Sequence, residues 1–226
     1  ESDSAESPAP AIVWKDAQTL DSESAAASFL STLPADARVA LLMQESGFSI
    51  AVENGVQAVI PFAQGLLGEG LDPLSAAKAL EPLLTGSRRL ILFNAKRLKT
   101  ELAPWNLSVS APFDDDQIMQ YLIAPQSGKY EAPENAAALF TRTLSDEQTL
   151  NEQEMTRLYR EIELPLLDTL YAMERDGFLV DRGELARLGA QYDAQIAGLK
   201  EEIFSLCDSA PFNLNSPQQL GDILFN

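Results

Sequence analysis

The chain has 226 residues, of which 46% are hydrophobic and 22% charged, a composition typical of a folded globular protein. It contains no histidine, which excludes Ser-His-Asp and Cys-His catalysis as well as His-ligated zinc. A single cysteine, Cys207, excludes an internal disulfide, and the formal net charge of −18 disfavours a free-standing nucleic-acid binder.

No apolar run reaches the roughly 18 residues of a membrane span, and we expect a cytoplasmic protein with no membrane partner.

Residues 1–10 are rich in Ser, Ala, Pro and acidic residues and predict a linker. Short apolar segments then predict strands at 12–14, 38–43, 48–52, 56–60, 89–93 and 107–109. Asn54-Gly55, between the third and fourth of these, is typical of a tight hairpin turn. Capping residues and amphipathic spacing predict helices at 21–33, 73–84, 94–102 and 114–123.

Three consecutive acids, Asp114, Asp115 and Asp116, open the last of these helices. We favour stabilisation of the helix dipole as their role over metal binding, because successive helical side chains point about 100° apart. The order of strands and helices predicts an α/β domain over residues 11–150, with a mixed sheet and flanking helices.

Residues 151–226 differ in character. Apolar residues spaced by three and four predict two long helices, over 151–176 and 181–208, in a long antiparallel helical arm. Pro165 interrupts the first helix and predicts a kink, and Gly177 ends it. Ser216 caps a third helix, within which the chain stops at Asn226, and this indicates a fragment of a longer protein.

Two motifs resemble bacterial A-family (DNA polymerase I-like) enzymes: EIELPLLDTLYAMERDGFLVD at 161–181 and FNLNSPQQLGDILF at 212–225. Weaker similarity covers most of residues 11–150. The resemblance implies a ribonuclease H-like 3′–5′ exonuclease domain followed by the first thumb helices, truncated, at 151–226. It also implies DNA as a partner, and the remaining palm, fingers and thumb as neighbours in the same chain. Mg²⁺ is expected in the polymerase site of the parent protein, with no cofactor in this fragment.

In proofreading members of the family, four carboxylates hold two metal ions in the exonuclease domain. The alignment places these positions at Met43, Glu45 and Leu98, and the last motif at Tyr130 and Glu134. A thioether is a soft, weak ligand and leucine has no oxygen, so two of the four ligands are lost. The resemblance therefore implies degenerate positions, no metal and no catalytic residue, and a domain that serves as a structural brace.

Candidate DNA contacts come from two places. Arg88, Arg89, Lys96, Arg97 and Lys99 lie in a stretch of twelve residues without an acid, for which a solvated patch is the alternative. The second motif adds three candidates, which are Asn213, Asn215 and Ser216.

Two alternatives to an inactive polymerase fragment stay open. In the first, Glu45, Glu134 and the Asp114–Asp116 cluster form a rearranged metal site with residual exonuclease activity. In the second, the chain is a non-enzymatic protein-interaction module.

Overall fold

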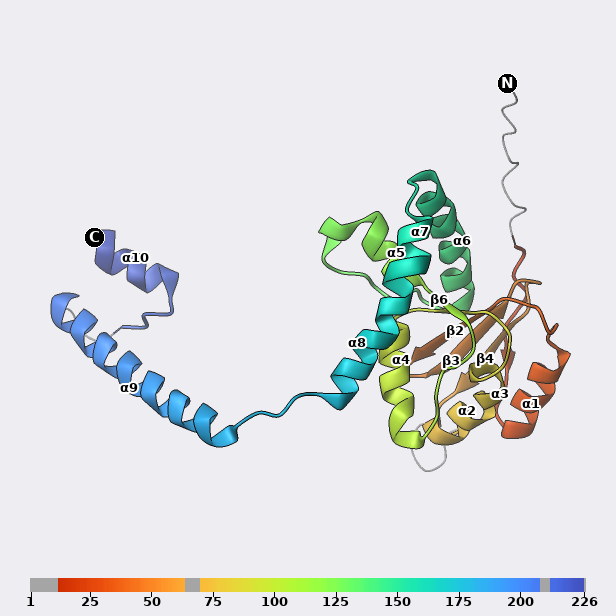
Figure 1. Ribbon diagram of the computed structural model, residues 1–226, viewed down its shortest axis with the longest axis horizontal. Coiled ribbons are helices and arrows are strands. Elements are labelled where there is room, and N and C mark those ends of the chain that lie inside the picture. Colours follow the sequence, from red (N-terminus) through yellow and green to blue (C-terminus); the bar gives the residue numbers. More distant parts are fainter. Residues whose placement is uncertain (1–11, 64–69, 208–211, 226) are drawn as a thin grey trace, which may run out of the picture. The chain divides into compact units, whose positions relative to one another are not determined.

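The computed structural model describes residues 12–63, 70–207 and 212–225, so the linker expected at 1–10 lies outside the described residues. Its centre is a mixed β-sheet with helices on both faces (Figure 1). Among the described residues, six strands stand in the order β1-β4-β3-β2-β5-β6. Neighbours β2, β5 and β6 are parallel, as are β1 and β4, whereas β3 is antiparallel to both its neighbours. The strands are β1 (Gln18–Thr19), β2 (Val39–Gln44), β3 (Gly47–Val52), β4 (Gln57–Pro61), β5 (Leu90–Leu92) and β6 (Phe113–Asp115).

The helices of the described ranges flank this sheet or follow it. They are α1 (Glu23–Thr32), α2 (Pro73–Ala79), α3 (Glu81–Leu84), α4 (Ala95–Leu102), α5 (Asp116–Ile123), α6 (Ala136–Glu152), α7 (Thr156–Leu158), α8 (Leu164–Asp176), α9 (Arg182–Cys207) and α10 (Pro217–Phe225). Two short 3₁₀ turns, η1 (Ala103–Trp105) and η2 (Pro125–Ser127), and a π-helical turn, η3 (Tyr159–Glu163), complete them. Within the described ranges, no helix is both long and apolar enough to cross a membrane.

Strand β2 shows why both faces of the sheet are covered. Its side chains alternate between the faces, as they must in a strand. Val39 and Leu41 join the large apolar core with α1, α2, α3 and α4, whereas Ala40 and Leu42 pack with Phe140 of α6. The apolar run of β2 is thus buried on both sides, as predicted, and the mixed sheet with flanking helices agrees with the ribonuclease H-like architecture that the resemblance implies.

The hairpin between β3 and β4 is also confirmed. Gly55 has φ +82°, and a Cβ there would lie 2.3 Å from the carbonyl oxygen of Val13. The Asn54 side chain accepts a hydrogen bond from the Val56 N–H at 3.2 Å. Glycine is therefore required at this turn both by the backbone angle and by a close neighbour.

Two predicted strands are wrong. Neither residues 12–14 nor 107–109 are paired as strands in the described structure. Trp14 instead packs edge-on against Phe140, and Leu107 and Val109 are buried as part of an irregular connection. The third parallel strand is β6, where the sequence predicts the start of a helix, so Asp114 and Asp115 belong to a strand.

Helix α6 is absent from the sequence-based prediction. It begins after Asn135, whose side chain accepts from the Ala138 N–H at 2.9 Å. The buried residues of this helix were the available signal, because they recur at helical spacing: Ala136, Ala137, Leu139, Phe140, Thr143, Asp146 and Leu150. The continuous helix predicted over 151–176 is wrong, because α6 ends at Glu152 and is followed by α7, η3 and α8. Pro165, where the sequence predicts a kink, is the second residue of α8, directly after η3.

The chain divides into two compact units, 1–176 and 177–226. Residues 151–176, which the sequence assigns to the polymerase domain, therefore lie in the first unit with the sheet. The second unit holds α9 and α10, and none of the residues of α9 is buried. The Asp181 side chain caps α9 by accepting from the Glu184 N–H at 3.0 Å, as its sequence predicts.

Candidate functional site

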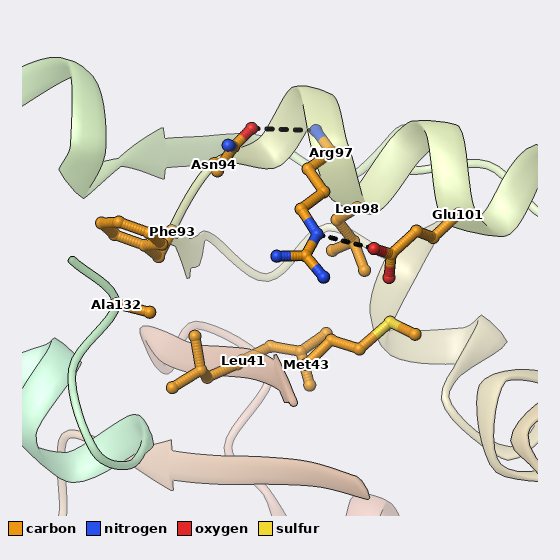
Figure 2. Close-up of a pocket in the computed structure, with 9 residues that line it drawn as sticks. Leu41, Met43, Phe93, Asn94, Arg97, Leu98, Glu101 and Ala132 are labelled. Atoms are coloured by element: carbon orange, nitrogen blue, oxygen red, sulfur yellow. Dashed lines mark hydrogen bonds and ion pairs between the residues drawn. The ribbon is translucent and has the colours of Figure 1, made fainter. Parts of the chain in front are cut away.

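A pocket of about 60 Å³ lies at the carboxyl ends of the parallel strands β2 and β5 (Figure 2). Helix α4 faces the end of β2 across it. We call it the strand-end pocket, and its lining consists of Leu41, Leu42, Met43, Phe93, Asn94, Arg97, Leu98, Glu101 and Ala132.

Two of the positions aligned with exonuclease metal ligands meet in this pocket. Met43 comes from the end of β2 and Leu98 from α4, and Figure 2 shows both among the lining side chains. Mg²⁺ requires hard oxygen ligands, whereas these two residues offer a thioether and a hydrocarbon. The donor set of the strand-end pocket does not fit a pair of magnesium ions.

The one carboxylate that lines the strand-end pocket is paired with an arginine of the same helix. Among its lining residues Glu101 alone carries a carboxylate, and Arg97 Nε donates to it at 2.6 Å. That hydrogen bond, followed by Coulomb attraction to Glu101, raises the pKa of Arg97. The permanent guanidinium charge opposes a divalent cation at the same place.

The other aligned positions lie outside this lining. Glu45 is exposed in the turn between β2 and β3. The Tyr130 hydroxyl donates to the Ala124 carbonyl at 2.9 Å, and Glu134 is exposed, its carbonyl accepting from Gln44 Nε2 at 3.1 Å. In the part of the chain that the structure describes, no three His, Cys, Asp or Glu side chains are grouped so that they could hold a metal ion.

The consecutive aspartates have three different roles, which corrects the interpretation that they serve the helix dipole together. Asp115 is buried and caps two helices, since its carboxylate accepts from the Ala95 N–H of α4 at 2.6 Å and from the Ile118 N–H of α5 at 3.2 Å. Burial raises the pKa of Asp115 to about 6, against the opposing effect of these backbone hydrogen bonds. This carboxyl group is a structural cap.

Asp116, the first residue of α5, is held by α6. Its carboxylate accepts from Arg142 Nε and from the Thr143 hydroxyl, both at 2.9 Å. Burial raises the pKa of Asp116, and the hydrogen bond from Arg142 opposes that rise. Asp116 therefore fastens α5 to α6.

Asp114 is the centre of a charged cluster that we call the Asp114 network. Arg89 donates to its two oxygens at 2.5 and 3.0 Å, although the carboxylate is fully buried. The Tyr159 hydroxyl accepts from the Asp115 N–H at 2.9 Å and lies 3.3 Å from Asp114 Oδ1. Burial raises the pKa of Tyr159, so this hydroxyl keeps its proton. The members of the network are Arg38, Arg89, Asp114, Glu147, Tyr159 and Arg160.

The Asp114 network extends to α6 through Arg38, which donates to both oxygens of Glu147 at 2.9 and 2.8 Å. The sequence does not reveal this network because its partners are far apart in the chain, from 25 residues between Arg89 and Asp114 to 109 between Arg38 and Glu147. No local pattern signals such pairs.

The basic stretch is free of acids in sequence but not in space. Arg88 donates to the carbonyls of Leu33 and Pro34, both at 2.8 Å, at the end of α1. Lys96 and Lys99 pair with carboxylates of α8, Arg89 pairs with Asp114, and Arg97 pairs with Glu101. Each of the five DNA-contact candidates of this stretch thus has a partner within the chain.

The three candidates of the second unit form a local turn before α10. Ser216 Oγ accepts from the Gln219 N–H at 3.4 Å, and the Asn213 side chain accepts from the Asn215 N–H at 3.0 Å. Gln219 in turn accepts from the Asn213 N–H at 2.8 Å. These contacts account for the start of α10 at Pro217.

Comparison with known proteins gives partial matches along the chain. DNA polymerase I of Lactococcus lactis is 33% identical over 134 residues, covering 59% of this chain and 14% of that protein. DNA polymerase I of Chloroflexus aurantiacus is 41% identical over 103 residues, covering 44% of this chain and 10% of that protein. The chain is thus similar in sequence to parts of bacterial DNA polymerase I.

A longer alignment joins the chain to the thermostable DNA polymerase I of Thermus caldophilus, which is 29% identical over 185 residues. It covers 76% of this chain but 21% of that polymerase, so the chain spans only a small part of its DNA polymerase I relatives. No family model matches the chain. Among solved structures, RNase D of Escherichia coli, an exoribonuclease, superposes with a TM-score of 0.45 at 15% identity, over 73% of this chain and 52% of RNase D.

Proposed function

We propose that the chain is part of a DNA-directed DNA polymerase acting in DNA replication and repair, and that residues 11–150 are a non-catalytic, 3′–5′ exonuclease-like brace. The similarity to DNA polymerase I supports DNA as the partner of the whole protein. Its proposed location is the bacterial cytoplasm, at the nucleoid. Palm, fingers and thumb would be its neighbours in the same chain. Mg²⁺ would serve the polymerase site of the whole protein, and the exonuclease-like part would take none.

The observation that carries the proposal is the chemistry of the strand-end pocket. Phosphodiester hydrolysis by two metal ions needs carboxylates that hold both ions about 4 Å apart. At the end of β2 and on α4 the pocket instead presents Met43 and Leu98, and its one carboxylate is paired with Arg97. These contacts support the proposal that the pocket has a structural role and not a catalytic one.

A structural role is supported by where the buried charge lies. Asp114, Asp115 and Asp116 are all buried, and each joins elements that are distant in sequence. Buried carboxylates with full sets of partners fix the arrangement of the elements around them. An inactive domain that braces a polymerase needs this rigidity more than it needs a reactive group.

The test is a nuclease assay with a 5′-labelled single strand and a 5′-labelled primer–template, each in Mg²⁺ and in Mn²⁺. We expect the chain neither to shorten the 3′ end nor to extend the primer. Metal-dependent shortening that disappears in Glu45→Gln or Glu134→Gln would contradict the proposal and favour the residual exonuclease. The alternative of a non-enzymatic protein-interaction module would be excluded if the reading frame beyond Asn226 encodes a palm with two metal-binding aspartates.

A further inference from the structure

Helix α8 lies alongside α4 in the first compact unit (Figure 1). Its one buried residue, Leu167, reaches the apolar core. Two ion pairs also join the two helices. They involve the two lysines of α4 that the sequence marks as candidates for DNA contact, Lys96 and Lys99.

Lys99 is enclosed from several sides. Its ammonium group forms an ion pair with Asp168 of α8 and lies 5.0 Å from the ring centre of Phe113 and 5.9 Å from that of Tyr171. The Tyr171 hydroxyl also donates to the Lys99 carbonyl at 3.4 Å. Only 11% of the Lys99 side chain is exposed, and residues of α8 and Phe113 of β6 lie around it.

Lys96 lies one helical turn before Lys99 and is bound more loosely. Its Nζ donates to Glu174 Oε1 at 2.8 Å, with 35% of the lysine side chain exposed. The carboxylates of Asp168 and Glu174 are themselves about 60% exposed. Both pairs thus join a lysine of α4 to an acid at the surface of α8.

We propose that α8 is an intramolecular competitor of nucleic acid, because Asp168 and Glu174 occupy the two lysines of α4 that a phosphate backbone would otherwise contact. The inference does not depend on whether the exonuclease-like unit is catalytic. It explains how the two lysines of a stretch that is basic in sequence are paired with acids on the folded molecule.

Competition has a measurable size. Exposed ion pairs contribute roughly 0.2–1 kcal/mol each, which corresponds to about 1.4- to 5-fold per pair. Each phosphate contacted on a single strand adds about 0.7 to the slope of log affinity against log salt. By linkage, a strand that binds these lysines must loosen α8 to the same extent that α8 weakens the strand.

The experiment compares two double variants of the whole chain. Asp168→Asn with Glu174→Gln removes the carboxylates that hold the lysines. Glu161→Gln with Asp176→Asn removes two equally exposed carboxylates from the same helical segment, where they pair with Arg157 and Arg175 instead. The net charge changes equally, so any difference between the variants comes from the α4 lysines.

Binding of a fluorescent oligothymidine is measured from about 20 to 200 mM salt. We expect the first variant to bind about 2- to 25-fold more tightly at low salt, with a slope steeper by about 1.4, and the control to match the wild type. Adding Lys96→Gln and Lys99→Gln to the first variant should cancel the gain. Equal gains in both variants, or a gain that survives loss of the lysines, would overturn the proposal.

A variant with a single substitution keeps the test valid if the double variant does not fold. Glu174→Gln changes one exposed side chain, and its gain should be about 1.4- to 5-fold with a slope change of about 0.7. In this folded variant, saturating oligothymidine should speed amide hydrogen exchange in α8 but not in α6. An affinity equal to that of the wild type, together with unchanged exchange in α8, would refute competition.

Discussion

The strand-end pocket and the Asp114 network are built around the same parallel strands but treat charge in opposite ways. In the pocket, at the carboxyl ends of β2 and β5, two aligned ligand positions hold Met43 and Leu98. In the network, Arg38 and Arg89 directly precede the same two strands and surround a fully buried Asp114. A buried carboxylate is present where it joins elements together, and no carboxylate stands at the two pocket positions where hydrolysis would use one.

The largest effect that distinguishes these two regions is expected from Asp114→Ala. Removing one partner of a buried ion pair leaves the other uncompensated, which costs about 3–5 kcal/mol. We expect about 3 kcal/mol, because Arg89 still reaches water with 36% of its side chain. Urea unfolding measures the loss. As the matched change in the pocket, Glu101→Gln should cost less than about 1 kcal/mol, and equal losses would show that the two regions do not differ.

A second comparison uses pH and Asp115. Its folded pKa of about 6 lies above the ordinary aspartate value of 3.8, so the neutral carboxyl is favoured by folding. Its contribution to stability is full below pH about 4 and is lost as pH rises through about 6, by at most about 3 kcal/mol. The free energy of unfolding of the wild type minus that of Asp115→Asn should therefore fall between pH 4 and 7. A difference that is constant with pH would show that burial does not perturb this group.

Tyr159→Phe tests the neutral member of the Asp114 network. The change removes a hydroxyl that binds the Asp115 N–H and Asp114, and should cost about 1–2 kcal/mol in thermal or urea unfolding. Tyr171→Phe, which loses one 3.4 Å hydrogen bond at a partly buried site, is the control and should cost less. A larger loss in the control would mean that α8 depends on α4 rather than on the network.

The smallest effect is expected where carboxylates are restored to the pocket. Met43→Asp with Leu98→Asp should leave nuclease activity in Mg²⁺ near the background, because Glu45 lies in an exposed turn and Arg97 still carries its charge at the pocket. Misplacement of a catalytic group by about 1 Å can cost roughly a hundredfold in rate. Robust metal-dependent shortening of a 3′ end by this double variant would show that the two ligands alone were missing.

The sequence predicts those parts of the fold that depend on neighbouring residues. The turn at Gly55, the cap at Asn94 and the apolar strand β2 all follow from local chemistry. The same holds for the pocket, where the family alignment brings Met43 and Leu98 together and the structure places them in one lining.

Long-range pairing is what the sequence does not reveal. Leu107 and Val109 are of residue types typical of strands, but the third parallel strand is formed by Phe113–Asp115. Asp114 is accommodated in that strand because Arg89 and Tyr159 supply its partners. An aspartate is a poor strand residue until its distant partners are known. The sequence does not predict the ion pairs of Lys96 and Lys99 for the same reason, since their partners lie 78 and 69 residues away along the chain.

The π-helical turn η3 sets the phase of α8. Leu164 N–H bonds to the carbonyl five residues back, at Tyr159, so the turn holds one residue more than an α-helical turn would. Deleting one residue from this turn would rotate all that follows by about 100° around the helix axis. Asp168 and Glu174 would then leave the lysines of α4 although the composition of α8 is unchanged. The pairing of these lysines is thus a property of helix phase, set by a single inserted residue.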